Sequence, residues 1–285
     1  MKNIGFIGVG YMGYGIAKNI LSNKNKLFVI ANKNRKPIDR IVKEGAEEVK
    51  LLEDFANKKL DALFMCVTNT PIAKTISEKI SKILNNKTII IDITTHNKTG
   101  SIEVDAIFKK NDISYIECPV MGGPVQAAEG ALGGIVGATQ ENFKKSEPYL
   151  KYFCKEYFYF GEVGMGAKSK LLNNFLSLGN GALVNHLAIG AKELGLDLQK
   201  VFDVAKLGSG NSAALNRVFD NLLKGDFTGF KFTASNSVKD LTYIQDLLKD
   251  LPEAEKVAEV NKNYFQKAVN QGYGENFISE LINKK

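Results

Sequence analysis

Residues 5–20 read "GFIGVGYMGYGIAKNI" and contain the most informative motif of the chain. Gly8, Gly10 and Gly13 have the spacing G-x-G-x-x-G, directly after an apolar run and before an amphipathic one. Between a strand and a helix, the first glycine permits the tight turn and the second lets the backbone approach a pyrophosphate. The third allows close packing of the helix on the strand, and the helix N-terminus offers N–H groups to the phosphates. The stretch therefore predicts a dinucleotide-binding domain rather than a glycine-rich turn without a ligand.

Strand-like and helix-like patterns alternate from residue 3 to about residue 160. Runs rich in Ile, Val and Phe predict strands within residues 4–10, 26–32, 61–67, 87–94 and 114–120. Amphipathic segments predict helices at 11–22, 37–44 and 71–84, and two further stretches, 130–138 and 156–161, are additional strand candidates. This alternation with nearly continuous apolar strands indicates an α/β fold, a parallel sheet covered on both faces.

The pattern changes after Gly161, where the sequence shows helical periodicity and no clear strand. Residues 165–193 are apolar nearly all round, which predicts one long buried helix. We therefore expect a Rossmann-type NADP-binding domain at residues 1–160 and an all-helical substrate and dimerisation domain at residues 161–285. We expect the active site in the cleft between them. Because such a helix is buried more easily in an oligomer than in a small monomer, we also expect a homodimer or homotetramer.

Composition narrows the classes of partner. The net charge of +7 is scattered along the chain, and no zinc-finger, RNP or basic-helix pattern is present, so a small anionic ligand is favoured over nucleic acid. Three widely spaced cysteines form neither a metal-ligand pair nor a disulfide framework, which indicates a reducing compartment and no metal site. Residues 175–191 are interrupted by polar side chains and make a poor membrane span. The first strand begins near residue 3, leaving no room for a signal peptide, so we expect a cytoplasmic protein.

The end of the second predicted strand bears on the choice of cofactor. Enzymes that use NAD often place Asp or Glu there for the ribose hydroxyl, whereas residues 29–36 read "VIANKNRK" without an acid. Asn32, Lys33 and Arg35 instead offer cationic and hydrogen-bonding groups suited to a 2′-phosphate. We predict a preference for NADP(H) over NAD(H). The alternative is an ordinary solvated basic loop.

Further stretches complete a pattern of motifs. They are "DITT" at 92–95, "ECPVMGG" at 117–123, Gly161–Asn174 with "KLLNN" at 170–174, and "KDL" at 239–241. With the glycine motif and Asn32–Asn34, which matches a family "NRT", the chain resembles the β-hydroxyacid dehydrogenases. This family includes 3-hydroxyisobutyrate dehydrogenase and the semialdehyde reductases. The resemblance covers most of the chain and implies NADP-linked interconversion of a short aldehyde acid and its hydroxy acid. Glyoxylate and the succinic, methylmalonate and tartronate semialdehydes are the substrates that it suggests.

The resemblance also implies roles for residues. Lys170 matches the catalytic acid/base, and Asn174 matches an amide that holds substrate or lysine. Positions 170, 173 and 174 are i, i+3 and i+4, which places Asn173 on the same helical face. Burial disfavours the charged form of a lysine, and this suits proton transfer to a developing alkoxide. The alternative is a lysine that reaches solvent, with asparagines bonded to a neighbouring helix.

The substrate loop and the cofactor crevice complete the expected site. Gly122 and Gly123 are expected to leave backbone N–H groups for a substrate carboxylate, while Met121 replaces the family's serine and removes a hydroxyl donor. This replacement fits a larger or less polar substrate. The remaining cofactor contacts implied by the resemblance and by the strand ends are Tyr11, Met12, Val67, Thr68, Thr95 and Lys239. The alternative for Lys239 is an ion pair with Asp240 or another nearby acid.

Two other functions are compatible with this fold. Imine reductases resemble the family but usually lack the lysine, which Lys170 supplies here. A non-catalytic nucleotide-sensing protein on the same fold would be expected to lose the lysine or the glycine loop and to gain a basic extension. This chain keeps the first two and lacks the third, so both alternatives rank below the dehydrogenase.

Overall fold

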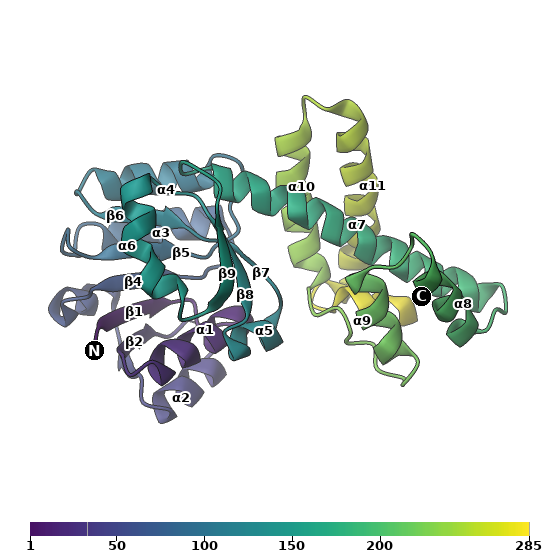
Figure 1. Ribbon diagram of the computed structural model, residues 1–285, viewed down its shortest axis with the longest axis horizontal. Coiled ribbons are helices and arrows are strands. Elements are labelled where there is room, and N and C mark those ends of the chain that lie inside the picture. The colour runs from purple at the N-terminus through teal and green to yellow at the C-terminus, as the bar shows by residue number, and fades with distance from the viewer. Residues whose placement is uncertain (33, 285) are drawn as a thin grey trace. The chain divides into compact units, whose positions relative to one another are not determined.

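The computed structural model describes residues 1–32 and 34–284 of the chain (Figure 1). Its contacts divide into two compact units, Met1–Lys170 and Leu171–Lys285. The division falls inside one long helix, α7 (Met165–Glu193). The functional boundary expected near residue 160 stays a prediction.

The first unit is built on a six-stranded parallel sheet with the order β3-β2-β1-β4-β5-β6. Its strands are β1 (Asn3–Ile7), β2 (Lys26–Ile30), β3 (Glu47–Val49), β4 (Ala62–Met65), β5 (Ile89–Asp92) and β6 (Ser114–Glu117). The chain runs outward from β1 in one direction to β3 and then returns to the other side of β1 to build β4–β6. Because the strand order reverses between β1 and β4, ligands are expected outside the carboxyl ends of these strands.

Both faces of this sheet are buried, which explains the continuous apolar runs in its strands. Ile4 and Phe6 pack into one core cluster with residues of α1, α2 and α6, whereas Ile7, Leu63 and Met65 pack into a second with α3, α4 and η1. The helices of this unit before α7 are α1 (Tyr11–Ser22), α2 (Lys36–Lys43), η1 (Leu52–Lys58), α3 (Thr70–Ile80), α4 (Gly100–Lys109), α5 (Pro124–Glu129) and α6 (Gln140–Leu150). Alternate side chains along each strand therefore anchor opposite layers of helices.

A smaller sheet follows β6. It has the order β7-β8-β9, with β7 (Val120–Met121) antiparallel to β8 (Leu132–Val136) and β8 parallel to β9 (Cys154–Tyr159). A β-bridge between Glu117 and Gly137 ties the end of β6 to the chain just after β8. The segment from Glu117 to Met121 is thereby fixed between two sheets.

The second unit is helical. After α7 it contains α8 (Leu198–Leu207), α9 (Ala213–Leu222), α10 (Ala234–Leu248), α11 (Pro252–Ala268), a π-helical turn (Val269–Tyr273) and a short 3-10 helix (Ile278–Asn283). Asn185 of α7 is fully buried in its core, and its Nδ2 donates to the Ile278 carbonyl at 2.6 Å and to the Tyr264 hydroxyl at 2.9 Å. The neighbouring His186 ring packs against the Tyr264 ring, with 4.6 Å between the ring centroids.

The expected fold class is confirmed, and most expected elements are present. The strands within 4–10, 26–32, 61–67, 87–94 and 114–120 are β1, β2, β4, β5 and β6, and the two additional candidates are β8 and β9. The long helix spans Met165–Glu193 as predicted. The three-residue strand β3 was not anticipated. Within the described part of the chain, no helix has both the length and the apolar character that a membrane span requires.

Candidate active site

The turn between β1 and α1 has the backbone geometry that the glycine motif predicts. Gly8 has φ +100°, and a Cβ added there would lie 2.1 Å from the Cys66 carbonyl oxygen. A Cβ on Gly13 would lie 2.1 Å from the Gly8 carbonyl oxygen, so the helix can approach the strand only with glycine at this position. At Gly10, by contrast, no described heavy atom lies within 4 Å of an added Cβ.

The N-terminus of α1 is open at this turn. Gly10 is the N-cap residue and supplies no side-chain cap, and the first turn of the helix holds no acidic residue. Tyr11 at the first helical position is 80% exposed. An open backbone cradle at the N-terminus of a 12-residue helix fits the pyrophosphate of a dinucleotide.

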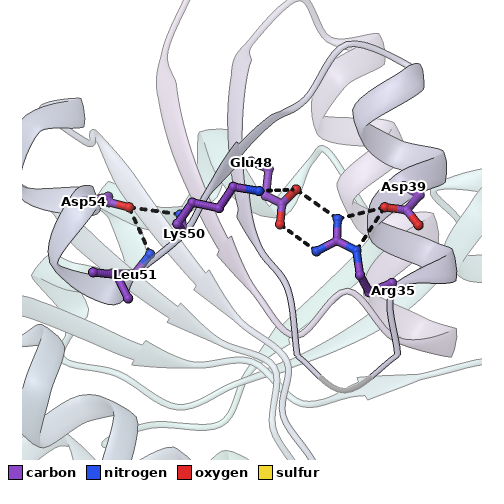
Figure 2. A network of polar contacts seen from close by, with 6 residues as sticks. All are labelled: Arg35, Asp39, Glu48, Lys50, Leu51 and Asp54. Atoms are coloured by element: carbon purple, nitrogen blue, oxygen red, sulfur yellow. Dashed lines mark hydrogen bonds and ion pairs between the residues drawn. The ribbon is translucent and has the colours of Figure 1, made fainter.

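The loop after β2 carries the residues expected to select the cofactor. Asn32 and Asn34 are exposed, and Asn34 Oδ1 accepts from the Lys36 N–H at 3.1 Å. Lys33 lies outside the described residues. Arg35 precedes α2, and its guanidinium lies between two carboxylates, those of Asp39 and Glu48 (Figure 2).

Glu48 is an acid near this loop that the local sequence around β2 does not reveal. It belongs to β3 and pairs in register with Val29 of β2, which brings its carboxylate to 2.9 Å from Arg35 Nη1. Lys50 Nζ lies 3.2 Å from the other oxygen of the same carboxylate. The hydrogen bonds from Arg35 lower the pKa of Glu48 to about 2, so this group is ionised at neutral pH. The acid was overlooked because β3 was not recognised and strand pairing alone brings it to this loop.

The ends of β4 and β5 meet through Thr94. The Val67 N–H donates to Thr94 Oγ1 at 3.2 Å, and the Thr94 N–H donates to Asp92 Oδ1 at 2.9 Å. Thr68 is exposed and Thr95 half-buried at this edge of the sheet, the carboxyl ends where a dinucleotide is expected. The hydrogen bonds of the buried Thr94 thus hold Val67, Thr68 and Thr95 near the carboxyl ends of β4 and β5.

His96 is part of a buried polar network beneath this loop. Its Nε2 lies 2.8 Å from Asp92 Oδ2, and its Nδ1 lies 3.2 Å from Thr70 Oγ1. Tyr115 also donates to Asp92 Oδ2, at 3.1 Å, and its pKa is raised well above its ordinary value by burial and by the Asp92 charge. Both His96 and Asp92 are fully or almost fully buried. The network fixes the "DITT" loop and gives His96 a structural role.

A buried glutamate holds the start of α7. Glu117 is fully buried, and its Oε1 accepts from the Gly164 and Gly166 N–H groups at 2.6 and 2.9 Å. Its Oε2 accepts from the Ala167 N–H at 3.2 Å. A carboxylate at a helix N-terminus satisfies donors that have no partner within the helix and complements the helix dipole. The motif at 117–123 does not by itself indicate this role for Glu117, because the partners of the carboxylate lie far along the chain.

Lys170 reaches the strand that follows Glu117. Its Nζ donates to the Val120 carbonyl oxygen at 2.8 Å and lies 3.4 Å from Met121 Sδ. Only 9% of Lys170 is exposed. The amine is therefore placed at the beginning of the "VMGG" loop by a main-chain oxygen, which is a contact that no side-chain pattern predicts.

The two glycines of this loop differ in their backbone donors. Gly122 has φ +113°, and a Cβ there would lie 2.8 Å from Leu132 Cδ2. The Gly123 N–H donates to Gln126 Oε1 at 2.9 Å, at the start of α5. The expectation that both N–H groups stay open is therefore corrected at Gly123, because Gln126 side-chain capping uses that donor.

In the second unit, Asn174 and Lys239 converge on one carboxylate. Asn174 Nδ2 donates to Asp240 Oδ2 at 2.6 Å, and Lys239 Nζ lies 2.8 Å from Asp240 Oδ1. Asp240 is 1% exposed, whereas Asn173 is exposed. The ion pair that was the alternative for Lys239 is present, and a reach from Lys239 to the cofactor stays a prediction. Among residues 1–32 and 34–284, no group of three or more His, Cys, Asp or Glu could hold a metal ion.

Comparison with known families agrees with this geometry. A family model described as the NAD binding domain of 6-phosphogluconate dehydrogenase matches residues 3–161. A second, described as NAD-binding of NADP-dependent 3-hydroxyisobutyrate dehydrogenase, matches residues 164–284. The chain belongs to the β-hydroxyacid dehydrogenase family. Membership of this family supports an NAD(P)-dependent hydroxyacid dehydrogenase activity and the binding of a nicotinamide dinucleotide.

Individual relatives are distant but cover most of the chain. A 2-(hydroxymethyl)glutarate dehydrogenase of Eubacterium barkeri is 28% identical over 231 residues, which are 79% of this chain and 76% of that protein. The crystal structure of a 3-hydroxyisobutyrate dehydrogenase from Salmonella typhimurium has a TM-score of 0.88 at 24% identity, with 98% of each chain covered. The structure of Psf3 in complex with NADP+ and 2-OPP has a TM-score of 0.85 at 25% identity, again with 98% of each chain covered.

Proposed function

We propose that this member of the family is an NADPH-dependent enzyme that interconverts a short aldehyde acid and its hydroxy acid, with Lys170 as the proton donor. The observation that carries the proposal is the position of the Lys170 amine, 2.8 Å from the Val120 carbonyl oxygen at the start of the substrate loop. A buried lysine fixed beside a loop of glycines is suited to binding a polarised oxygen atom of a substrate.

Lys170 has two tasks in this reaction. Its N–H donates to the carbonyl oxygen of the aldehyde and stabilises the negative charge that develops there. It then transfers a proton to that oxygen, or takes one from the hydroxyl group in the reverse direction. When bound, the nicotinamide supplies or accepts the hydride.

Recognition of the substrate carboxylate is proposed to depend on the loop backbone. Because Gly123 donates to Gln126, we assign the carboxylate to the Gly122 N–H, with Asn173 and Asn174 as further proposed contacts. Met121 replaces a hydroxyl donor by an apolar thioether next to Lys170. This composition favours substrates with an apolar segment between the aldehyde and the acid, such as succinic or methylmalonate semialdehyde, over glyoxylate or tartronate semialdehyde.

The preference for NADPH is supported by the loop after β2. No acid lies between the end of β2 and Arg35, and Asn32 and Asn34 offer exposed amides. One of the solved relatives is bound to NADP+. Glu48 opposes this preference through its contact with Arg35, so we expect a modest rather than an absolute discrimination against NADH.

We also propose that the enzyme acts as a homodimer or homotetramer in the cytoplasm. All three cysteines, Cys66, Cys118 and Cys154, are free, as expected in a reducing compartment.

The test is oxidation of NADPH and NADH by the purified protein with a panel of short aldehyde acids, with Lys170→Ala and Lys170→Arg in parallel. We expect faster turnover with NADPH and a loss of about a hundredfold or more in kcat for Lys170→Ala, because general acid catalysis contributes about that much. Lys170→Arg keeps the charge but is a poor proton donor, so it should lose nearly as much. Titration of each variant with NADPH serves as the control for folding and should change the Kd by less than about threefold.

The alternatives predict different results. Turnover that survives Lys170→Ala would refute the proposed role of the lysine. Reduction of imines but not of aldehydes by the wild-type protein would indicate the imine reductase function. Tight binding of NADPH without turnover of any compound would indicate the nucleotide-sensing protein.

A further inference from the structure

Arg35 is held on both edges of its guanidinium group (Figure 2). Nη1 and Nη2 donate to Glu48 Oε1 and Oε2 at 2.9 and 3.0 Å, which occupies the end of the group. Nε and Nη2 donate to Asp39 Oδ1 at 3.3 and 2.8 Å, which occupies its side. Because a guanidinium has five N–H donors, one N–H of Nη1 is left without a partner among the described residues.

This arrangement conflicts with phosphate binding. Arginine binds a phosphate most strongly through two parallel N–H donors on one edge. Both edges of Arg35 that offer such a pair are taken by carboxylates. Arg35 can therefore accept a 2′-phosphate in this way only after one of the two carboxylates has moved.

The charges around Arg35 also disfavour the binding of a phosphate. Arg35 and Lys50 are balanced by Asp39 and Glu48, so the cluster presents no net positive charge to a ligand. A phosphate monoester carries a charge of about −1.5 to −2 at neutral pH and is repelled by both carboxylates. Glu48 is also the better anchored of the two acids, since its side chain is 14% exposed against 52% for Asp39.

We propose that Glu48 is a specificity-determining residue, which weakens the binding of NADPH by occupying the edge of Arg35 that a 2′-phosphate would take. The proposal rests on the proposed use of NADPH by this enzyme. NADH has no 2′-phosphate, so its affinity does not depend on this contact. Glu48 thereby sets how far the enzyme discriminates between the two dinucleotides.

Protonation does not break this contact near neutral pH. The hydrogen bonds from Arg35 lower the pKa of Glu48 to about 2, so the carboxylate stays ionised there. A substitution is needed to test the proposal.

The test is the Kd of NADPH and of NADH for Glu48→Gln, measured by fluorescence titration without substrate at low ionic strength. Glutamine has the size of glutamate but neither its charge nor a second acceptor oxygen, so it frees one donor of the Arg35 end and leaves a net positive cluster. We expect the Kd of NADPH to fall about three- to tenfold, since charge-assisted bonds at exposed sites contribute on that order. The Kd of NADH should change by less than about twofold.

Glu47→Gln is the matched control. Glu47 precedes Glu48 in β3 and pairs with Lys58 rather than with Arg35. Its substitution removes the same charge one residue away, so it should leave the Kd of NADPH within about twofold. The second control repeats Glu48→Gln in an Arg35→Ala background, where its effect on NADPH should be clearly smaller, because only the direct repulsion between Glu48 and the phosphate remains.

The outcomes separate this proposal from the cofactor preference. An unchanged ratio of the two Kd values in Glu48→Gln overturns the role of Glu48, as does an equal gain in Glu47→Gln or in the Arg35→Ala background. Wild-type protein that binds NADH as tightly as NADPH overturns the proposed preference only. A gain for NADPH in Glu48→Gln would then still support the inhibitory contact.

Discussion

Glu117 accepts three backbone N–H groups at the start of α7 and has no exposure to solvent. The surrounding residues leave no room for a larger neighbour. A Cβ on Gly137 would lie 2.1 Å from Glu117 Oε1, and one on Gly166 would lie 3.0 Å from it. Because α7 carries Lys170, the glutamate fixes the helix from which the amine extends. Loss of its acceptor oxygens would leave buried donors unsatisfied, at about 1–3 kcal/mol each.

Burial of this carboxylate makes stability depend on pH. Desolvation raises the pKa of Glu117 above its ordinary value of 4.5. Between 4.5 and the raised value the folded protein binds more protons than the unfolded chain, so the free energy of unfolding falls as the pH rises through this window. Above this window Glu117 is ionised in both states, and its effect on the free energy of unfolding no longer changes with pH.

Glu117→Gln tests this linkage because glutamine does not titrate. The variant loses one acceptor and should be less stable throughout, by about 1–2 kcal/mol at low pH. The difference in Tm between wild type and variant should shrink as the pH rises from about 4 to 7. Thermal unfolding followed by circular dichroism measures it, with Glu156→Gln at an exposed position of β9 as the control. A Tm difference that does not vary with pH would contradict the argument.

In the turn between β1 and α1, the two glycines Gly8 and Gly10 have different roles, one in folding and one in ligand binding. Gly8 has a positive φ and an added Cβ would lie 2.1 Å from the Cys66 carbonyl oxygen, so only glycine fits the turn. Gly10 has an ordinary extended backbone with open space around it. Gly8 is therefore needed by the fold, and Gly10 by the ligand that approaches it.

Substitution by alanine should reveal this difference. Gly8→Ala should lower the free energy of unfolding by more than about 2 kcal/mol, whereas Gly10→Ala should change it by less than about 1 kcal/mol. Gly10→Ala should still weaken dinucleotide binding about tenfold or more, because its methyl group stands where the pyrophosphate approaches. Urea unfolding and fluorescence titration of both variants provide the measurements. Unimpaired binding by Gly10→Ala would show that the dinucleotide does not use this turn.

The elements that were predictable from sequence are those with local patterns. The glycine motif, the apolar strands and α7 each have a periodicity that a short window contains. The three-residue strand β3 has too few residues for such a pattern, and Glu48 was missed with it. Glu117 and the Val120 carbonyl were missed for another reason. Their partners lie far along the chain: Gly166 is 49 residues beyond Glu117, and Lys170 is 50 residues beyond Val120. Only the folded chain brings these pairs together.

Helix α7 carries an apolar stripe that the described residues of this chain leave exposed. Leu172, Leu176, Leu183 and Leu187 are 50%, 65%, 68% and 38% exposed. Their spacing of four, seven and four residues places them on one side of the helix. Side chains of this kind in a row are expected to be buried against a second copy of the chain.

Leu176→Glu combined with Leu183→Glu should therefore convert the proposed oligomer to monomer, because each introduced carboxylate would lose its solvation in the interface. Sedimentation of the variant at micromolar concentration measures the change. Val204→Glu, a similarly exposed apolar position on α8, is the control and should leave the mass unchanged. A wild-type protein that is already monomeric would refute the expectation, as would a double variant that keeps the wild-type mass.

The anchor of Lys170 has a consequence for how this enzyme can diversify. The oxygen that holds the amine belongs to the main chain of Val120, and every residue type supplies such an oxygen. The thioether of Met121 is only a weak acceptor beside it. If Lys170 acts as proposed, replacement of the side chain at 121 should alter which substrates are accepted while the lysine amine keeps its place. Natural or laboratory selection at position 121 could therefore change the substrate specificity without displacing Lys170.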